Sequence, residues 1–295
     1  MKKKFYIFIS FFCVLFFFSI TVLNAEHYPL GIEGIKAGSL PPAGKYLKVY
    51  NQYYKTSKIL THTGDRIPVS PTKITSFASA FRLLYVSNYE ILGAAYAADI
   101  IIPFVNLDIN FANYDYNVFG LSDITVEPFA LGWHKKNYDV TAAAGYTFRT
   151  GPYDEIRPFA PSKGYNTILL TAGGTYYPDK EKKWSLSALS RYEIHDSLKS
   201  SDTKYGQNYF IEWGIGNQFS KTLDLGISGY CQWQTSKDKG NTVSVYKDKV
   251  YAAGPEFTKV FPDSKLILSC KMLFEFGVKS RAQGNTAVVS LTRIF

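Results

Sequence analysis

The sequence predicts an all-β protein: an antiparallel transmembrane β-barrel of about twelve strands, preceded by a signal peptide. Three observations lead to this prediction. The 295-residue chain is 46% hydrophobic and 17% aromatic, mostly Tyr and Phe, which favour strands. Long segments alternate between apolar and small or polar side chains, and the connectors between them alternate between short and long. That combination is typical of an outer-membrane barrel.

The chain starts with MKKKFYIFISFFCVLFFFSITVLNA, in which lysines precede an apolar run. This order is typical of a secretory signal peptide over residues 1–25, and an uncleaved anchor helix is the alternative. Cleavage would remove three lysines, so the formal charge would fall from +9 to +6. So small an excess gives no indication of nucleic acid, and contact with anionic lipid is as plausible. We expect residues 26–44 to form a periplasmic segment and residues 45–295 the barrel.

The stretch KLILSCKMLFEFGV at 265–278 illustrates the period of two. Side chains of successive strand residues point to opposite faces, so Phe274 would face lipid while Lys271 and Glu275 would face the lumen. Glu275→Gln should then alter passage more than folding. Similar segments predict strands near 45–57, 74–88, 89–112, 121–135, 138–150, 165–178, 183–196, 207–219, 222–235, 249–261, 264–278 and 285–295.

The connectors alternate in length along the chain. The short connectors lie near 87–89, 135–137, 178–182, 220–222 and 261–264. The longer connectors lie near 58–73, 113–120, 151–164, 197–206, 236–248 and 279–284. A soluble β-sandwich is the alternative, but closure into a barrel removes the edge strands that a large sheet must otherwise protect.

Aromatic residues flank the short turns, as in an interfacial girdle. They are Tyr85, Tyr89, Trp133, Tyr138, Tyr177, Trp184, Phe219 and Phe261. The terminal Phe295 closes an alternating strand and resembles the signal read by the barrel-assembly machinery, although Arg293 replaces the usual aromatic. We therefore predict a location in the cell outer membrane, with membrane lipid and lipopolysaccharide as surroundings.

The sequence offers no pattern for catalysis, a metal or a cofactor. Its four histidines are not in metal-ligand spacing, and no nucleophile elbow or P-loop is present. His195 shares a face with Arg191 and Glu193, but a hydrolase would need a Ser partner that the sequence does not identify. Cys231 and Cys270 lie on apolar faces of separate segments, which favours free thiols over a disulfide.

Charged residues on the inward-facing side of the strands predict a lumen of mixed sign. They are Arg82, Asp99, Asp123, Glu127, Arg149, Arg191, Glu193, Glu212, Glu256, Lys271 and Glu275. Such charges need partners, so pairing across strands is at least as plausible as substrate contact. Pro103, Pro128 and Pro255 each remove a ladder donor and predict kinks, which either shape the barrel or open a lateral path.

Three stretches resemble the bacterial outer-membrane family named for the meta-pathway of phenol degradation. They are GIEGIKAGSLPPAGKYL near the mature start, FGLSDITVEPFALGWH at 119–134 and YTFRTGPYD at 146–154. The resemblance implies a barrel that takes up hydrophobic or aromatic compounds, and it transfers no binding site.

The first functional hypothesis is therefore a passive channel for small hydrophobic or aromatic solutes. The second is a structural or adhesive barrel whose loops bind partners or lipopolysaccharide. Basic loop residues would then meet phosphates: Arg157, Lys163, Lys237, Lys239, Lys247, Lys249 and Arg281. A barrel-embedded lipid hydrolase is the weakest hypothesis.

Overall fold

The computed structural model describes residues 29–153, 159–199, 201–240 and 244–295. The expected signal peptide and its cleavage site lie outside the described residues. Within the described part of the chain, no helix is long and apolar enough to cross a membrane.

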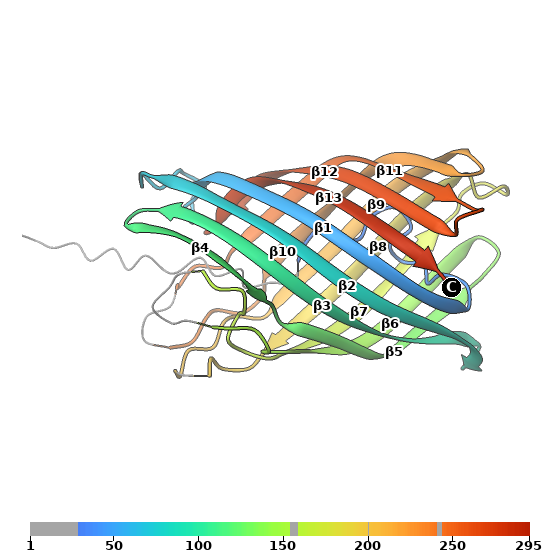
Figure 1. Cartoon of the computed structure of the whole chain (residues 1–295), viewed down its shortest axis with the longest axis horizontal. Helices are drawn as coiled ribbons and strands as arrows, with labels where there is room; N and C mark the ends of the chain where they lie inside the picture. The colour runs from blue at the N-terminus through green and yellow to red at the C-terminus, as the bar shows by residue number, and fades with distance from the viewer. Residues whose placement is uncertain (1–28, 154–158, 200, 241–243) are drawn as a thin grey trace, which may run out of the picture.

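Thirteen strand segments form a single antiparallel sheet that closes on itself (Figure 1). The strands are β1 (Gly44–Ile59), β2 (Thr72–Ile91), β3 (Ala94–Phe111), β4 (Tyr114–Leu121), β5 (Ile124–His134), β6 (Tyr138–Phe148), β7 (Thr167–Tyr176), β8 (Trp184–His195), β9 (Asn208–Ser220), β10 (Leu223–Gln234), β11 (Lys249–Phe261), β12 (Leu266–Lys279) and β13 (Ala282–Ile294). Both β4 and β5 pair with β3, one after the other along its length, so they share one position in the wall. The barrel therefore has twelve strand positions, as the sequence predicts.

Closure comes from β1, which pairs with β2 on one side and with the last strand, β13, on the other. Tyr50, for example, lies opposite Ala80 in β2 and Ser290 in β13. Every other strand segment also has a neighbour on both sides except β4, which pairs with β3 alone, so the wall is closed at the level of β5 and has an open strand edge beside β4.

The predicted two-faced pattern is present in β12. Lys271 and Glu275 are buried inside the barrel, whereas the Phe274 side chain between them points outward and is 46% exposed. Cys231 and Cys270 are free thiols. The alternation arises because the outer face meets hydrocarbon while the inner face meets polar side chains.

Three predicted connectors differ from the structure. β2 continues to Ile91, and the turn falls at Leu92 and Gly93, both with positive φ. The expected loop at 113–120 is instead strand β4, which follows a tight turn at Ala112. The expected loop at 279–284 is a tight turn at 280–281. In these places polar residues continue the strand period and were mistaken for loop.

The aromatic girdle beside the short turns is present at Tyr138, Trp184 and Phe219, which are 48%, 50% and 72% exposed. Tyr177 is an exception, because its side chain is buried and its hydroxyl donates to Asp139 at 2.9 Å. The terminal Phe295 is exposed, and its backbone N–H donates to the Lys45 carbonyl at 3.0 Å. The C-terminus therefore lies at the short-turn end of the barrel (Figure 1).

Candidate functional site

The lumen is crossed by the N-terminal segment, residues 29–43, which enters the barrel before β1 begins. We expected residues 26–44 in the periplasm, but the described part of that stretch is bound to the inner wall. The Leu30 carbonyl accepts from Gln52 Nε2 at 2.8 Å, and Ile32 is buried against Tyr50 and Phe210. The barrel is thus a wall built around its own amino-terminal residues.

Glu33 is the centre of this arrangement. Its carboxylate lies 3.0 Å from Arg82 Nη1 and 3.3 Å from Lys48 Nζ, and it accepts from the Tyr50 hydroxyl at 3.0 Å. Arg191 Nη2 lies 4.0 Å away. Three cations from three different strands therefore converge on one carboxylate of the segment.

The backbone of Glu33 is held as well as its side chain. Its N–H donates to Glu212 Oε1 at 3.0 Å, and its carbonyl accepts from Lys271 Nζ at 2.6 Å. Both of these wall residues were predicted to line the lumen. They pair in turn with charges on neighbouring strands, Glu212 with Arg191 and Lys271 with Glu256.

The segment continues along the wall through further polar contacts. Lys36 Nζ lies 2.7 Å from Asp224 Oδ2, and Ser39 Oγ donates to Asp139 Oδ2 at 2.7 Å. Lys36 and Asp224 come from parts of the chain that sequence reasoning did not connect. The segment is therefore anchored at several points between Leu30 and Ser39.

Two glycines allow the segment to lie directly on the wall. A Cβ at Gly34 would fall 1.9 Å from Glu256 Oε2, and a Cβ at Gly38 would fall 2.3 Å from the backbone of Gly174. A side chain at Gly38 would meet backbone, and one at Gly34 would displace the Glu256 carboxylate, which accepts from Ile35 N at 3.2 Å. The glycines at positions 34 and 38 are thus a close-packing requirement.

The predicted charged residues form several distinct groups in the wall. Arg82 bridges Asp99 and Glu127, with Nη2 2.5 Å from Asp99 Oδ2 and 3.2 Å from Glu127 Oε2. Glu275 accepts from the hydroxyls of Tyr54 and Tyr230, at 3.2 Å and 2.6 Å. The sequence allowed two roles for these charged residues, pairing across strands or contact with a substrate. In the structure they pair across strands.

Glu193 and His195 lie in a separate buried group toward the long loops. Glu193 Oε1 is 3.7 Å from Lys163 Nζ. The two ring nitrogens of His195 each lie 2.9 Å from a polar partner, Thr167 Oγ1 and Asn208 Nδ2. This is the environment of a packed histidine.

Asp123 has a different role from the one predicted. It lies at the break between β4 and β5 and holds the loop after β6, accepting from Ser162 Oγ at 2.6 Å and from Lys163 N at 2.9 Å. Thr150 Oγ1 donates to the Ser122 carbonyl at 2.9 Å. The GLSD and RTG portions of two family-like motifs therefore meet at this loop.

Arg149 and the strand prolines complete the predicted set. Arg149 is exposed just beyond the end of β6, so it is no part of the buried charged wall. Pro103 lies where β3 changes partner, since its carbonyl accepts from Ser122 N. Pro128 lies at register shifts on both sides of β5, and Pro255 lies in a stretch where the β11–β12 ladder is interrupted. All twelve strand positions remain paired around these prolines.

On the side of the barrel formed by β1, β2 and β3, the inner wall near the long loops is apolar. Six buried side chains form an apolar mouth cluster, which sequence reasoning missed because it sought charges. The cluster consists of Ile59, Ile74, Leu107, Ile109, Phe111 and Phe159. The rings of Phe111 and Phe159 meet edge to face, with centroids 6.4 Å apart. The inward positions of β3 could have revealed it, because they change from Asp99 to Leu107, Ile109 and Phe111 along the strand.

Comparison with known proteins places this barrel in a family. The family model described as "Putative MetA-pathway of phenol degradation" matches residues 56–291. The chain belongs to this family. No curated protein matches the sequence significantly.

Among solved structures, the chain is similar to the COG4313 outer membrane channel from Pseudomonas putida F1. That similarity has a TM-score of 0.78 at 16% identity and covers 92% of this chain and 100% of that one. The translocator domain of the autotransporter NalP from Neisseria meningitidis is less similar. It has a TM-score of 0.51 at 11% identity and covers 85% of this chain and 89% of that one. These similarities establish that the fold is that of an outer-membrane β-barrel. The protein is therefore located in the outer membrane.

Proposed function

We propose that the protein is an outer-membrane channel for passive uptake of small hydrophobic or aromatic compounds, closed at rest by its N-terminal segment. The observation that carries the proposal is the attachment of that segment. Within the lumen, the segment is held by Glu33 and a few other polar contacts, and the chain joins it to the wall at the start of β1. Removing or shifting it would free the lumen without breaking the wall.

The apolar mouth cluster supports the solute class. Leu107, Ile109 and Phe111 lie inside the barrel toward the long loops and are buried in one cluster with Phe159. Opening of this cluster would present apolar surface to a solute, which favours partition of apolar solutes from water. The family to which the chain belongs is described by phenol degradation, in line with aromatic solutes.

The alternative of a basic loop surface has less support. Lys163 is directed to Glu193, and Arg281 Nη1 donates to Gln232 Oε1 at 2.8 Å inside the barrel. Lys237, Lys239 and Lys247 are exposed, whereas Arg157 lies outside the described residues. The hydrolase hypothesis gains no observation from the packed environment of His195.

A reversible lock tests the proposal. Ser39→Cys with Asp139→Cys would tie the segment to the wall, because the parent side-chain oxygens are 2.7 Å apart. In proteoliposomes, we expect the oxidised double variant to exclude a membrane-impermeant aromatic carboxylate. Reduction should restore uptake to the level of the parent. The native Cys231 and Cys270 face lipid and cannot reach either new cysteine. The controls are the two single variants, Ser39→Cys and Asp139→Cys, which cannot form the lock.

A polar sugar of similar mass distinguishes a selective channel from a leak. We expect the aromatic carboxylate to enter several-fold faster than the sugar in the reduced protein. Equal rates for both solutes would overturn the proposed selectivity, and equal rates in locked and reduced protein would overturn the role of the N-terminal segment.

A further inference from the structure

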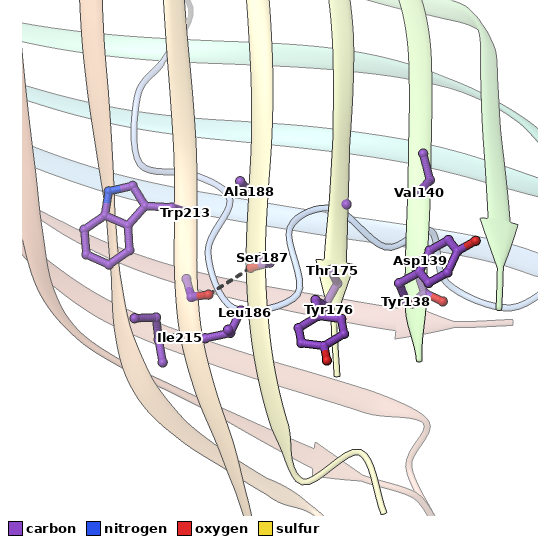
Figure 2. Close-up of a pocket in the computed structure, with 12 residues that line it drawn as sticks. Tyr138, Asp139, Val140, Thr175, Tyr176, Leu186, Ser187, Ala188, Trp213 and Ile215 are labelled. Carbon is purple, nitrogen blue, oxygen red and sulfur yellow. Dashed lines mark hydrogen bonds between the residues drawn. The ribbon is translucent and has the colours of Figure 1, made fainter. Parts of the chain in front are cut away.

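A groove of about 490 Å³ is hollowed into the lipid-facing side of the wall across β6–β9 (Figure 2). One row of cross-strand neighbours through the groove is Val140, Gly174, Ala188 and Trp213. The next row toward the short turns is Tyr138, Tyr176, Leu186 and Ile215. The groove exists because the middle two residues of the first row, Gly174 and Ala188, have little or no side chain between larger neighbours.

The groove is backed from within by the N-terminal segment. Gly38 lies against the backbone of Gly174, and the segment passes behind the four strands in Figure 2. Ser187, on the inward side of β8, donates to the Gly34 carbonyl at 3.2 Å. The floor is therefore supported on its inner side, and its outer side is open to hydrocarbon.

The groove ends at the headgroup level of the membrane. Tyr138 begins β6 and Tyr176 ends β7, and both rings are about half exposed in the girdle beside the short turns. Aromatic girdle residues mark the boundary between hydrocarbon and headgroups. An acyl chain in the groove would place its headgroup beside these turns.

The two short turns at that end are basic and touch each other. Lys182 Nζ donates to the Lys135 carbonyl at 3.4 Å, and Tyr177 N donates to the Asn137 carbonyl at 2.8 Å. Together residues 135–137 and 177–183 hold five lysines, Lys135, Lys136, Lys180, Lys182 and Lys183, against Asp179 and Glu181, for a net charge of +3. All five lysines are exposed.

The acids of these turns are already engaged. Asp179 accepts from the backbone N–H groups of Lys183 and Trp184, each at 2.8 Å, and Glu181 pairs with Lys183 at 2.5 Å. Among the described residues, the structure forms no ion pair with Lys135, Lys136 or Lys180. Their charges face the headgroup region uncompensated.

We propose that the groove and its lysine rim bind an anionic phospholipid of the periplasmic leaflet, with an acyl chain in the groove and the phosphate on the lysines. The apolar rows match a hydrocarbon chain, and the net charge favours an anionic over a zwitterionic headgroup. Basic residues at a membrane surface enrich anionic lipid several-fold per site. A second copy of the chain docked on this surface would place its own lysines against these lysines, and the like charges would repel.

Trp213 is a reporter inside the groove. A protein carrying Trp133→Phe, Trp184→Phe and Trp233→Phe keeps Trp213 as its one tryptophan. It would be reconstituted in phosphatidylcholine nanodiscs containing a small fraction of acyl-brominated phosphatidylglycerol or, in parallel, acyl-brominated phosphatidylethanolamine. We expect the anionic lipid to quench Trp213 fluorescence at least about threefold more strongly.

Two variants separate the headgroup and chain parts of the proposal. Lys135→Gln, Lys136→Gln and Lys180→Gln together should bring the quenching ratio close to one. The matched control Lys237→Gln, Lys239→Gln and Lys247→Gln, at the opposite end of the barrel, should keep the parent ratio. Ala188→Phe fills the groove and should also lower the ratio, whereas Ala287→Phe on β13 should not.

Equal quenching by both lipids in the reporter protein would overturn the proposal. A preference that survives the three groove-end lysine substitutions would overturn the headgroup site. A preference unchanged by Ala188→Phe would overturn the groove, and absence of quenching by either lipid would indicate that protein covers it. Heat-modifiable gel migration would confirm that each variant is folded.

Discussion

The two faces of one strand, β12, are held by different physics. On the outer face, Phe274 stands among Met272 and Phe276, all about half exposed to what would be lipid. On the inner face, Glu275 is buried and receives hydrogen bonds from Tyr54, Tyr230 and the Gly284 N–H. The outer residue needs only to be apolar, while the inner residue needs particular partners from distant parts of the chain. Substitutions on the inner face should therefore depend on partner identity, and those on the outer face on polarity alone.

The largest effect is expected for Glu33→Lys, which inverts the charge at the centre of the inner face. It would remove the carboxylate that pairs with Lys48 and Arg82 and add a cation beside them, although Arg82 would keep Asp99 and Glu127. Breaking a buried pair costs about 3–5 kcal/mol. We expect the N-terminal segment to detach, raising conductance in planar bilayers and exposing the segment to protease. Glu90→Lys, at an exposed position near the end of β2, is the control, and parent-like conductance of Glu33→Lys would contradict the arrangement.

Phe274→Arg tests the outer face. A cation near the middle of the bilayer costs about 2–4 kcal/mol in a barrel strand. The measurement is the free energy of unfolding by urea in lipid vesicles, with Phe274→Leu as the control. A loss below about 1 kcal/mol would show that this position lies near an interface, where such costs fall to that range.

Glu275→Gln tests the neighbouring inner position. The sequence suggested that this change would affect passage more than folding, but the structure predicts a loss of about 1–3 kcal/mol. The amide nitrogen of Gln cannot accept, so one of the three donors around the carboxylate loses its partner. Urea unfolding in the same vesicles measures the loss, and Glu90→Gln should be neutral. An equally neutral Glu275→Gln would restore the sequence-based prediction.

The smallest effect is expected for added bulk on the outer face. The side chain at position 287 points to lipid, and fluid hydrocarbon can accommodate the added ring. The unfolding free energy of Ala287→Phe should therefore stay within about 0.5 kcal/mol of the parent. One methyl on the inner side is expected to matter more. Gly34→Ala would place its Cβ 1.9 Å from Glu256 Oε2 and should loosen the N-terminal segment, measured as faster protease cleavage. If the two changes were equally silent, packing inside the lumen would be looser than the contacts imply.

Much of the lumen wall could be predicted because the strand period is local. Arg82, Glu212 and Lys271 were assigned to the interior from alternation alone. Glu212 and Lys271 are buried there, and Arg82 pairs there with Glu33, Asp99 and Glu127. Arg149 was misassigned because the period was extended one residue beyond the end of β6. Tyr177 was assigned to the girdle from its position near a turn, although burial beside Asp139 turns its ring inward.

Glu33 was missed for a different reason. It lies in a stretch without strand periodicity, and its partners are 15 to 238 residues away along the chain. The only local signal was an acid among closely spaced glycines, in a stretch that the sequence placed in a periplasmic segment. Glycine in such a stretch also permits close approach of two backbones, and that is its use at Gly34 and Gly38.

By itself, the sequence determined the barrel, its twelve strand positions and which way most side chains within the strands point, because lipid and lumen impose a period of two. The tertiary structure alone decided that the N-terminal segment lies in the lumen and that Phe159 joins the apolar side chains of β1, β2 and β3 in one cluster. It also decided that small residues on adjacent strands open a groove above basic turns. Those features depend on which residues become neighbours when the sheet closes, and closure brings together strands from opposite ends of the chain.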